Sequence, residues 1–302
     1  MGKSVLILVA LGVGLLWPGL EAYTFTLRPF LMVLLFFAFL DVRLDRSVFA
    51  VQQGYAAAVL PLMGAAVYLF GRLHSEDLGL TLFLMGLAPT AIITPVLAGL
   101  MRRRVAYLVG AILVTHAVFA VLVPLFLPAL LGVTLSVAAL AKLFFTIGST
   151  VAGPLVGAQL LRRWGGRALT ILRKLGTYSF ALFISNITVA AGSLSHYLRH
   201  AEGVPWSFVV LTTATVGGLM LINFYLGSRL APAGHRVEGS LALGRKNTML
   251  SIWIALEYIN PLVVLGPMLY ILLQNVFVAG QIAVVERRDR RRRRLKPVPT
   301  KP

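Results

Sequence analysis

The sequence predicts an all-α polytopic membrane protein in which ten transmembrane helices form two inverted five-helix repeats with broken fourth and ninth helices. Three observations support this prediction: the composition, a series of long apolar runs, and the placement of the charges. Hydrophobic residues make up 58% of the 302 positions and charged residues 13%, and the mean hydropathy is +0.86. A soluble domain has no core large enough to bury so much apolar surface.

Ten apolar runs have about the 20 residues that a helix needs to cross the hydrocarbon core. They cover residues 4–20, 25–41, 48–71, 78–101, 105–132, 135–161, 174–195, 206–230, 239–259 and 261–285. The first run also resembles a signal peptide, because it follows Lys3 and ends in the segment 20–22. We expect it to be retained, because its removal would unbalance the charge distribution.

Basic residues lie between the runs and set the expected topology. With a cytoplasmic N-terminus, only Arg28, Arg72 and Arg199 fall outside. The inner side then receives the basic tail and Lys3, Arg43, Arg46, Arg102, Arg103, Arg104, Arg162, Arg163, Arg167, Arg173, Lys174, Arg229 and Arg236. This asymmetry follows the positive-inside rule. We therefore expect a bacterial inner (plasma) membrane protein with both termini in the cytoplasm.

The net charge of +18 is not a sign of nucleic-acid binding, because the basic residues form no amphipathic face or recognition motif. The densest charge run is the tail, 287–302, which we expect to be disordered. An anionic-lipid patch there is the alternative to a simple stop signal. Pro297, Pro299 and Pro302 argue against further helix.

Ten spans divide into residues 1–133 and 134–286, and an odd number of spans in each half inverts the second repeat. Interruptions at matching places in two such halves indicate a transporter site. The fourth run contains Pro89, Thr90, Thr94 and Pro95, and the ninth contains the segment 244–248. Freed backbone at membrane depth persists only inside protein or beside a cavity. Prolines that merely kink a helix are the alternative interpretation.

The segment 244–248 is Gly244, Arg245, Lys246, Asn247 and Thr248. Two adjacent cations inside a lipid-spanning run are costly, and they mark a functional site by default. The sequence therefore predicts a binding site at this break, opposite the prolines of the fourth run.

Several short motifs surround the two breaks. They are Gly244-x-x-Asn247-x-x-Leu250 followed by Pro261, the Pro89-Thr90-Ala91 break, the arginine-rich loop 102–104, and Val105-Ala106 at the start of the fifth run. With the ten-helix order, these motifs resemble the bile acid:sodium symporter family. The resemblance implies a panel domain, a core domain in which the fourth and ninth helices unwind and cross, and uptake of organic anions by alternating access with two sodium ions.

The sequence departs from this family at the positions that hold sodium. The family's glutamate and glutamine before the asparagine correspond to Ala242 and Lys246, and its fourth-helix asparagine falls on Ile93 or Pro95. Hydroxyl ligands of the next helix fall on Leu108 and Ile112. Because a hard cation needs several oxygen ligands, we expect no sodium coupling.

Lys246 suggests a replacement for the missing cation. Its ammonium could stand in permanently for sodium, with Asn247, Thr248, Thr90 or Thr94 and freed carbonyls as partners. It could instead carry a proton. With Arg245, it could also attract an anionic substrate, helped by the half-helix that begins near Asn247. Alternatively, Arg245 reaches the cytoplasmic interface and Lys246 pairs with Glu238.

The remaining polar residues give weaker indications. His116 lies within the fifth run and suits proton transfer, although packing is the commoner role, and Lys142 is expected to reach the membrane surface. No enzyme motif or intramembrane acidic pair is present, and the absence of cysteine excludes thiolate ligands. We therefore expect no enzyme, cofactor or metal, and predict a sodium-independent carrier of small organic anions, proton-coupled or uncoupled. The alternative is a non-transporting integral membrane protein, structural or an intramembrane enzyme, that keeps the fold.

Overall fold

The computed structural model describes residues 3–42, 48–132, 134, 136–200 and 204–294. Over these residues the ordered elements are helices, and the one β-type contact is an isolated antiparallel bridge between Thr90 and Lys246. The predicted all-α class is therefore confirmed. Two arginines of the topology prediction, Arg43 and Arg46, lie outside the described residues. So do the three prolines of the tail, Pro297, Pro299 and Pro302.

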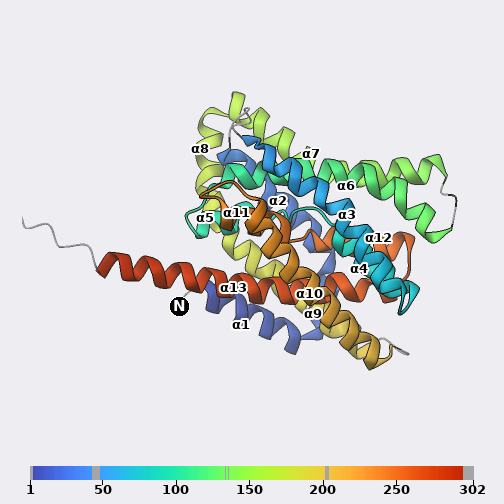
Figure 1. The fold of residues 1–302 in the computed structure, drawn as a ribbon. Coiled ribbons are helices and arrows are strands. Elements are labelled where there is room, and N and C mark those ends of the chain that lie inside the picture. The colour runs from blue at the N-terminus through green and yellow to red at the C-terminus, as the bar shows by residue number, and fades with distance from the viewer. Residues whose placement is uncertain (1–2, 43–47, 133, 135, 201–203, 295–302) are drawn as a thin grey trace, which may run out of the picture.

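The helices follow one another with short connections (Figure 1). In chain order they are α1 (Lys3–Leu16), η1 (Pro18–Thr26), α2 (Leu27–Asp41), α3 (Val51–Arg72), α4 (Glu76–Leu87), α5 (Thr94–Leu100), α6 (Val105–Leu131), α7 (Val137–Trp164), α8 (Gly166–Leu175), η3 (Gly176–Tyr178), α9 (Ser179–His200), α10 (Trp206–Leu230), α11 (Arg236–Gly244), α12 (Thr248–Tyr258), η4 (Pro261–Val264) and α13 (Leu265–Arg294).

Seven helical segments of the described chain are long and apolar enough to cross a membrane. They are Pro18–Leu40, Val51–Arg72, Val105–Leu131, Val137–Trp164, Gly166–His200, Trp206–Leu230 and Pro261–Val285, and Lys3–Leu16 is a shorter apolar helix. Large apolar side chains such as Phe25, Leu62 and Phe145 lie on the outside, where a lipid environment would cover them. These features indicate an integral membrane protein.

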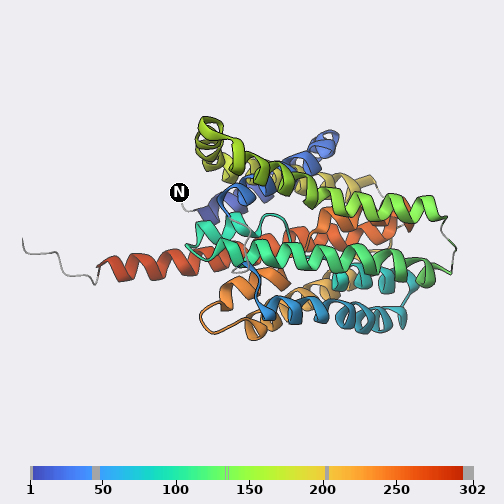
Figure 2. The same ribbon diagram turned by 90° about the horizontal axis from the view of Figure 1, so that it is seen from above.

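The helices pack in two layers (Figure 2). The first layer contains α1, α2, α7 and α9, and the second contains α3, α4, α10 and α11. Helices α6 and α13 lie between the layers and contact members of both. The short helices α5 and α12 pack on α6 and α13, respectively, so both broken segments lie in the interior of the fold.

Glycines allow the closest helix contacts in the second layer. A Cβ atom on Gly86 of α4 would lie 2.8 Å from Cα of Gly64 in α3, and one on Gly227 of α10 would lie 2.2 Å from the Gly239 carbonyl oxygen in α11. Any side chain there would force the backbones apart. Small residues of this kind are how membrane helices approach without a hydrophobic driving force.

Some helix ends differ from the predicted boundaries. α1 ends at Leu16, four residues early, because Pro18 cannot continue the helix. The stretch between the sixth and seventh runs, predicted as a charged loop, contains the amphipathic helix α8, which begins at Gly166 with a left-handed φ of 42°. Arg162 and Arg173 on either side of this bend donate to the Leu40 carbonyl at the end of α2.

The prediction of a disordered tail was wrong over residues 287–294. Helix α13 continues to Arg294 and extends beyond the rest of the fold (Figure 1). Arginine is a good helix former, and extending a helix that is already packed avoids the cost of nucleation. Residues 295–302 lie outside the described part of the chain.

Candidate functional site

The two predicted breaks are present, and they face each other inside the fold. Residues 88–93 separate α4 from α5, and residues 245–247 separate α11 from α12. The Ala91 amide donates to the Arg245 carbonyl, and the Asn247 amide donates to the Pro89 carbonyl, each at 2.8 Å. The backbone groups that each break removes from its own helix are thus paired with the other break, which satisfies the requirement that buried backbone be hydrogen-bonded.

The first break follows from its prolines. Pro89 has no amide to donate, and it forces Ala88 out of the helical region, to φ −50° and ψ 135°. Thr94 and Pro95 then start α5, where proline is tolerated because first-turn amides have no helical partner. The Thr94 hydroxyl donates to the Ala91 carbonyl at 2.7 Å.

The second break contains no proline. Arg245 is extended, with φ −93° and ψ 117°, and the close approach of α10 requires glycine at position 244. A Cβ atom on Gly244 would lie 2.3 Å from the ring of Phe224. The Gly244 carbonyl accepts from the Tyr270 hydroxyl of α13 at 2.8 Å.

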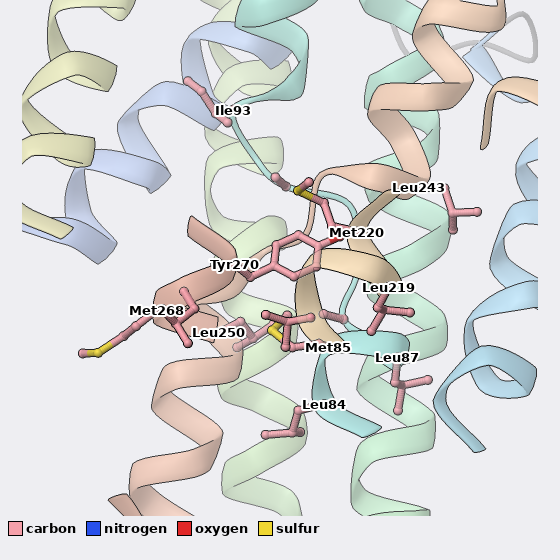
Figure 3. Packing of buried hydrophobic residues seen from close by; sticks show 14 of the residues in the cluster. Leu84, Met85, Leu87, Ile93, Leu219, Met220, Leu243, Leu250, Met268 and Tyr270 are labelled. Carbon is pink, nitrogen blue, oxygen red and sulfur yellow. The ribbon is translucent and has the colours of Figure 1, made fainter. Parts of the chain in front are cut away.

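An apolar cluster surrounds the breaks. Figure 3 shows Tyr270 between Met220 and Leu250, with Leu219 close by. These side chains exclude water from the polar backbone of the breaks, so the hydrogen bonds there are made in a medium of low dielectric constant.

Lys246 is 1% exposed, and its ammonium points to the end of α4. Nζ donates to the carbonyls of Gly86 at 3.2 Å and Ala88 at 3.0 Å. Freed carbonyls are therefore its partners, as one prediction stated, and hydroxyl groups are not. The alternative pairing with Glu238 is wrong, because Glu238 accepts from the Arg104 amide at 3.1 Å. The C-terminal end of a helix carries partial negative charge, which favours a cation.

Thr90 makes the matching contact in the opposite direction. Its hydroxyl donates to the Ala242 carbonyl at 2.6 Å, near the end of α11. The two central amides are also held alike, since the Thr90 amide donates to Thr115 Oγ1 of α6 and the Lys246 amide donates to Gln274 Oε1 of α13, each at 3.0 Å. Thr115 and Gln274 were missed by the sequence prediction.

Arg245 is 2% exposed, so the interpretation that it reaches the membrane surface is wrong. Its Nη1 donates to Asn275 Oδ1 at 3.0 Å and, at 3.4 Å, to the Gln274 carbonyl. Its guanidinium carbon lies 6.0 Å from the centroid of the Phe183 ring, within the range of a cation–π contact. Lys142, expected to reach the membrane surface, is exposed and pairs with Glu257.

His116 is buried and joins α6 to the second break. Nδ1 lies 2.9 Å from the Ile112 carbonyl, and Nε2 lies 3.0 Å from Asn247 Nδ2. Because a carbonyl only accepts, these contacts assign the proton to Nδ1. Nε2 then accepts from the side-chain amide of Asn247. Asn247 is the residue before α12 but gives that helix no side-chain cap. Thr248, the first residue of α12, is buried.

A small cavity of about 40 Å³ lies against the second break, between α9, α12 and α13. Arg245, Lys246, Asn247 and Thr248 line it on one side. A larger, more apolar pocket of about 260 Å³ shares Asn247 and Met249 with it and continues toward Arg28. Pro95 lines a separate pocket of about 240 Å³.

The site carries positive charge. Among the described residues, Lys246 and Arg245 form no ion pair with a carboxylate, and no group of three or more His, Cys, Asp or Glu side chains gathers there to hold a metal ion. Uncompensated buried cations are costly unless a bound anion or polar groups offset them. The arrangement is suited to binding an anion.

No known protein-family model matches the sequence, and no curated protein matches it either.

Proposed function

We propose that this protein is a secondary transporter of small organic anions that works by alternating access and does not require sodium. The observation that carries the proposal is the Lys246 ammonium, which is buried in the crossing of two broken helices and bonded to carbonyls of the opposite break. Broken helices that meet inside a membrane protein are typical of transporter sites.

Ten crossings can be assembled from the described helices. Seven are the long apolar segments, the eighth is the shorter α1, and the last two are the broken pairs α4–α5 and α11–α12. In this assignment, each half of the chain supplies five crossings, and one broken pair is the fourth crossing of each half.

The helix contacts support an inverted repeat of the two halves. If α1, α2, α3, α4–α5 and α6 correspond to α7, α9, α10, α11–α12 and α13, the contacts of one half recur in the other. Thus α3 packs on α4 as α10 packs on α11, and α1 packs on α9 as α7 packs on α2. Likewise, α5 packs on α6 as α12 packs on α13.

The location of the basic residues supports the expected orientation. The N-terminus, α5, α8, the start of α11 and the end of α13 lie toward one end of the molecule (Figure 1). Basic residues such as Arg104, Arg167 and Arg236 follow or belong to these segments. By the positive-inside rule, this end faces the cytoplasm.

Sodium independence is proposed because the ammonium occupies the carbonyl oxygens that a cation would need. Gly86 and Ala88 both direct their carbonyls to Lys246, and the Thr90 and Thr94 hydroxyls donate to backbone carbonyls. A hard cation bound there would have to displace a fixed positive charge. This geometry favours Lys246 as a permanent substitute for a bound cation.

The test is uptake of radiolabelled carboxylates by proteoliposomes containing the full chain. We expect the same uptake in sodium and in potassium buffer, and a loss of uptake in Lys246→Ala. Lys142→Ala, which removes an exposed lysine paired with Glu257, is the matched control and should transport normally.

Two outcomes would overturn the proposal. Sodium-stimulated uptake would show that another part of the site binds sodium. If a folded protein takes up none of the carboxylates, the alternative of a non-transporting integral membrane protein is favoured.

A further inference from the structure

We propose that Arg245 is the anion receptor of the cavity at the second break, and that it binds the carboxylate of a small monocarboxylate with an apolar body. The identification of this molecule as a substrate rests on the transport function proposed above. The binding site itself does not depend on that function.

The first observation is a free edge on a buried guanidinium. Nη1 of Arg245 is held by Asn275 Oδ1, whereas Nε is buried without a partner. Nη2 also makes no hydrogen bond with any residue that the structure describes. Nε and Nη2 form the side of a guanidinium that fits the two oxygens of a carboxylate in parallel. Because Asn275 and Phe183 hold the other parts of the group, this edge is oriented before any ligand arrives.

The second observation is the uncapped N-terminus of α12, an 11-residue helix whose first turn lines the same cavity. Asn is a favoured N-cap residue, yet Asn247 gives its side chain to His116. The Thr248 amide donates to the Lys246 carbonyl at 2.9 Å, and the next two amides of the turn, those of Met249 and Leu250, receive no cap from the Asn247 side chain. The positive end of the helix dipole adds to the attraction for an anion.

The remaining walls indicate the chemistry of the rest of the ligand. The amide side chains in the cavity are already engaged, since Asn186 donates to the Leu27 carbonyl and Asn275 donates to the Ile271 carbonyl. The other walls are apolar: Leu31, Ile93, Phe183, Ile187, Ala190 and Ile271. One open anion receptor with apolar surroundings matches one carboxylate on an apolar body. The cavity at the receptor is small, about 40 Å³, and has room only for the carboxylate. It adjoins the apolar pocket of about 260 Å³, with which it shares Leu31, Ile92, Asn247 and Met249, and this pocket would take the apolar body.

The two adjacent cations thus have different roles. Lys246 already donates to two carbonyls of the opposite break and stabilises the crossing. Arg245 keeps an unpaired edge and binds the ligand. A lysine at position 245 would keep the charge but lose the planar fork, so a conservative substitution separates receptor geometry from charge alone.

The experiment measures equilibrium binding of benzoate to the purified full chain in nanodiscs, as a ligand-dependent rise of the unfolding temperature and by calorimetry. Benzamide serves as the neutral analogue, and phthalate carries a second carboxylate. We expect benzoate to stabilise the wild type, benzamide to have no effect, and phthalate to bind more weakly. Arg245→Lys should raise the benzoate Kd about tenfold or more, because it loses a charge-assisted pair of hydrogen bonds.

Two further variants guard against loss of folding. Asn275→Asp places a carboxylate beside Nη1 and should weaken benzoate binding while the guanidinium stays in place. Arg229→Lys, at an exposed arginine over Tyr225, is the matched control and should bind benzoate like the wild type. Unchanged affinity in both Arg245→Lys and Asn275→Asp, equal binding of benzamide, or no binding of benzoate would overturn the assignment.

The two experiments distinguish a failure of the binding assignment from a failure of the transport function. If benzoate binds through Arg245 but proteoliposomes show no uptake, the receptor assignment stands and the transport function is wrong. If uptake occurs and is unchanged in Arg245→Lys, the transport function stands and the receptor assignment is wrong.

Discussion

The first and second breaks reach matching backbone geometries with different residues. Pro89 and a neutral threonine form the first, whereas a glycine and two cations form the second. In each break, a backbone amide donates to a carbonyl of the opposite break. In each, the amide of the bridged residue, Thr90 or Lys246, also donates to a side chain of α6 or α13, respectively. Mutual pairing therefore fixes the backbone, and the side-chain chemistry is free to differ.

The difference is clearest at the bridged pair. Thr90 donates to the carbonyl of Ala242, four residues before Lys246, and Lys246 donates to the carbonyl of Gly86, four residues before Thr90. A short hydroxyl reaches one carbonyl, and the longer ammonium reaches a second one at Ala88 as well. The position in the second break thus places a charge where the first break has none.

The largest expected effect comes from removing that charge. Lys246→Met leaves two buried carbonyls without a donor, at about 1–3 kcal/mol for each, partly offset by relief of the cost of burying the ammonium. We expect a net loss of about 3 kcal/mol in the free energy of unfolding, measured as resistance to denaturant in nanodiscs. Thr90→Val, which frees one carbonyl, should lose about 1 kcal/mol. Equal losses would mean that the two sides of the bridge contribute alike.

A smaller effect is expected where the second break needs glycine. Gly244→Ala would place Cβ 2.3 Å from the ring of Phe224, and this ring itself packs against Phe277, with the centroids 4.2 Å apart and the planes tilted by 32°. Overpacking of this kind costs about 2 kcal/mol, visible as a lower unfolding temperature. Gly280→Ala in α13 meets nothing within 4 Å and should be neutral or slightly stabilising.

The smallest expected effects concern the two acceptors from the long helices. Thr115→Val should leave the Thr90 amide unpaired, and Gln274→Leu should leave the Lys246 amide unpaired. Each variant should lose about 1 kcal/mol, and the two unfolding midpoints should fall together. A much larger fall in Gln274→Leu would show that the charged break depends on its side-chain partner more than the neutral one does.

Both breaks were predictable from sequence because their residues are conspicuous in apolar runs. Two prolines six positions apart mark the first break, and an Arg-Lys pair marks the second. Proline alone is not a sufficient signal, because Pro124 and Pro128 lie within the continuous helix α6. Freed carbonyls were among the predicted partners of Lys246, but the choice of Gly86 and Ala88 over the nearby hydroxyls was not predicted. The all-α class followed from composition and run length alone.

The partners on the long helices were not predicted, because their runs show no interruption. Thr115 is a single hydroxyl in an apolar helix, and Asn275 and Gln274 are a polar pair in the last run. That adjacent pair was a usable signal, since polar residues at membrane depth mark contacts. The identity of the break they serve depends on tertiary packing, which periodicity does not contain.

The reciprocal pairing of the breaks has a consequence for biosynthesis. The Ala91 amide and the Pro89 carbonyl find their partners at Arg245 and Asn247, more than 150 positions later in the chain. While the ribosome is still making the second half, those groups have no native partner, and the lipid interior supplies none. Membrane quality control should therefore recognise chains that stop short of Asn247 as defective. The first half inserted alone should be degraded, unless the second half is supplied as a separate polypeptide.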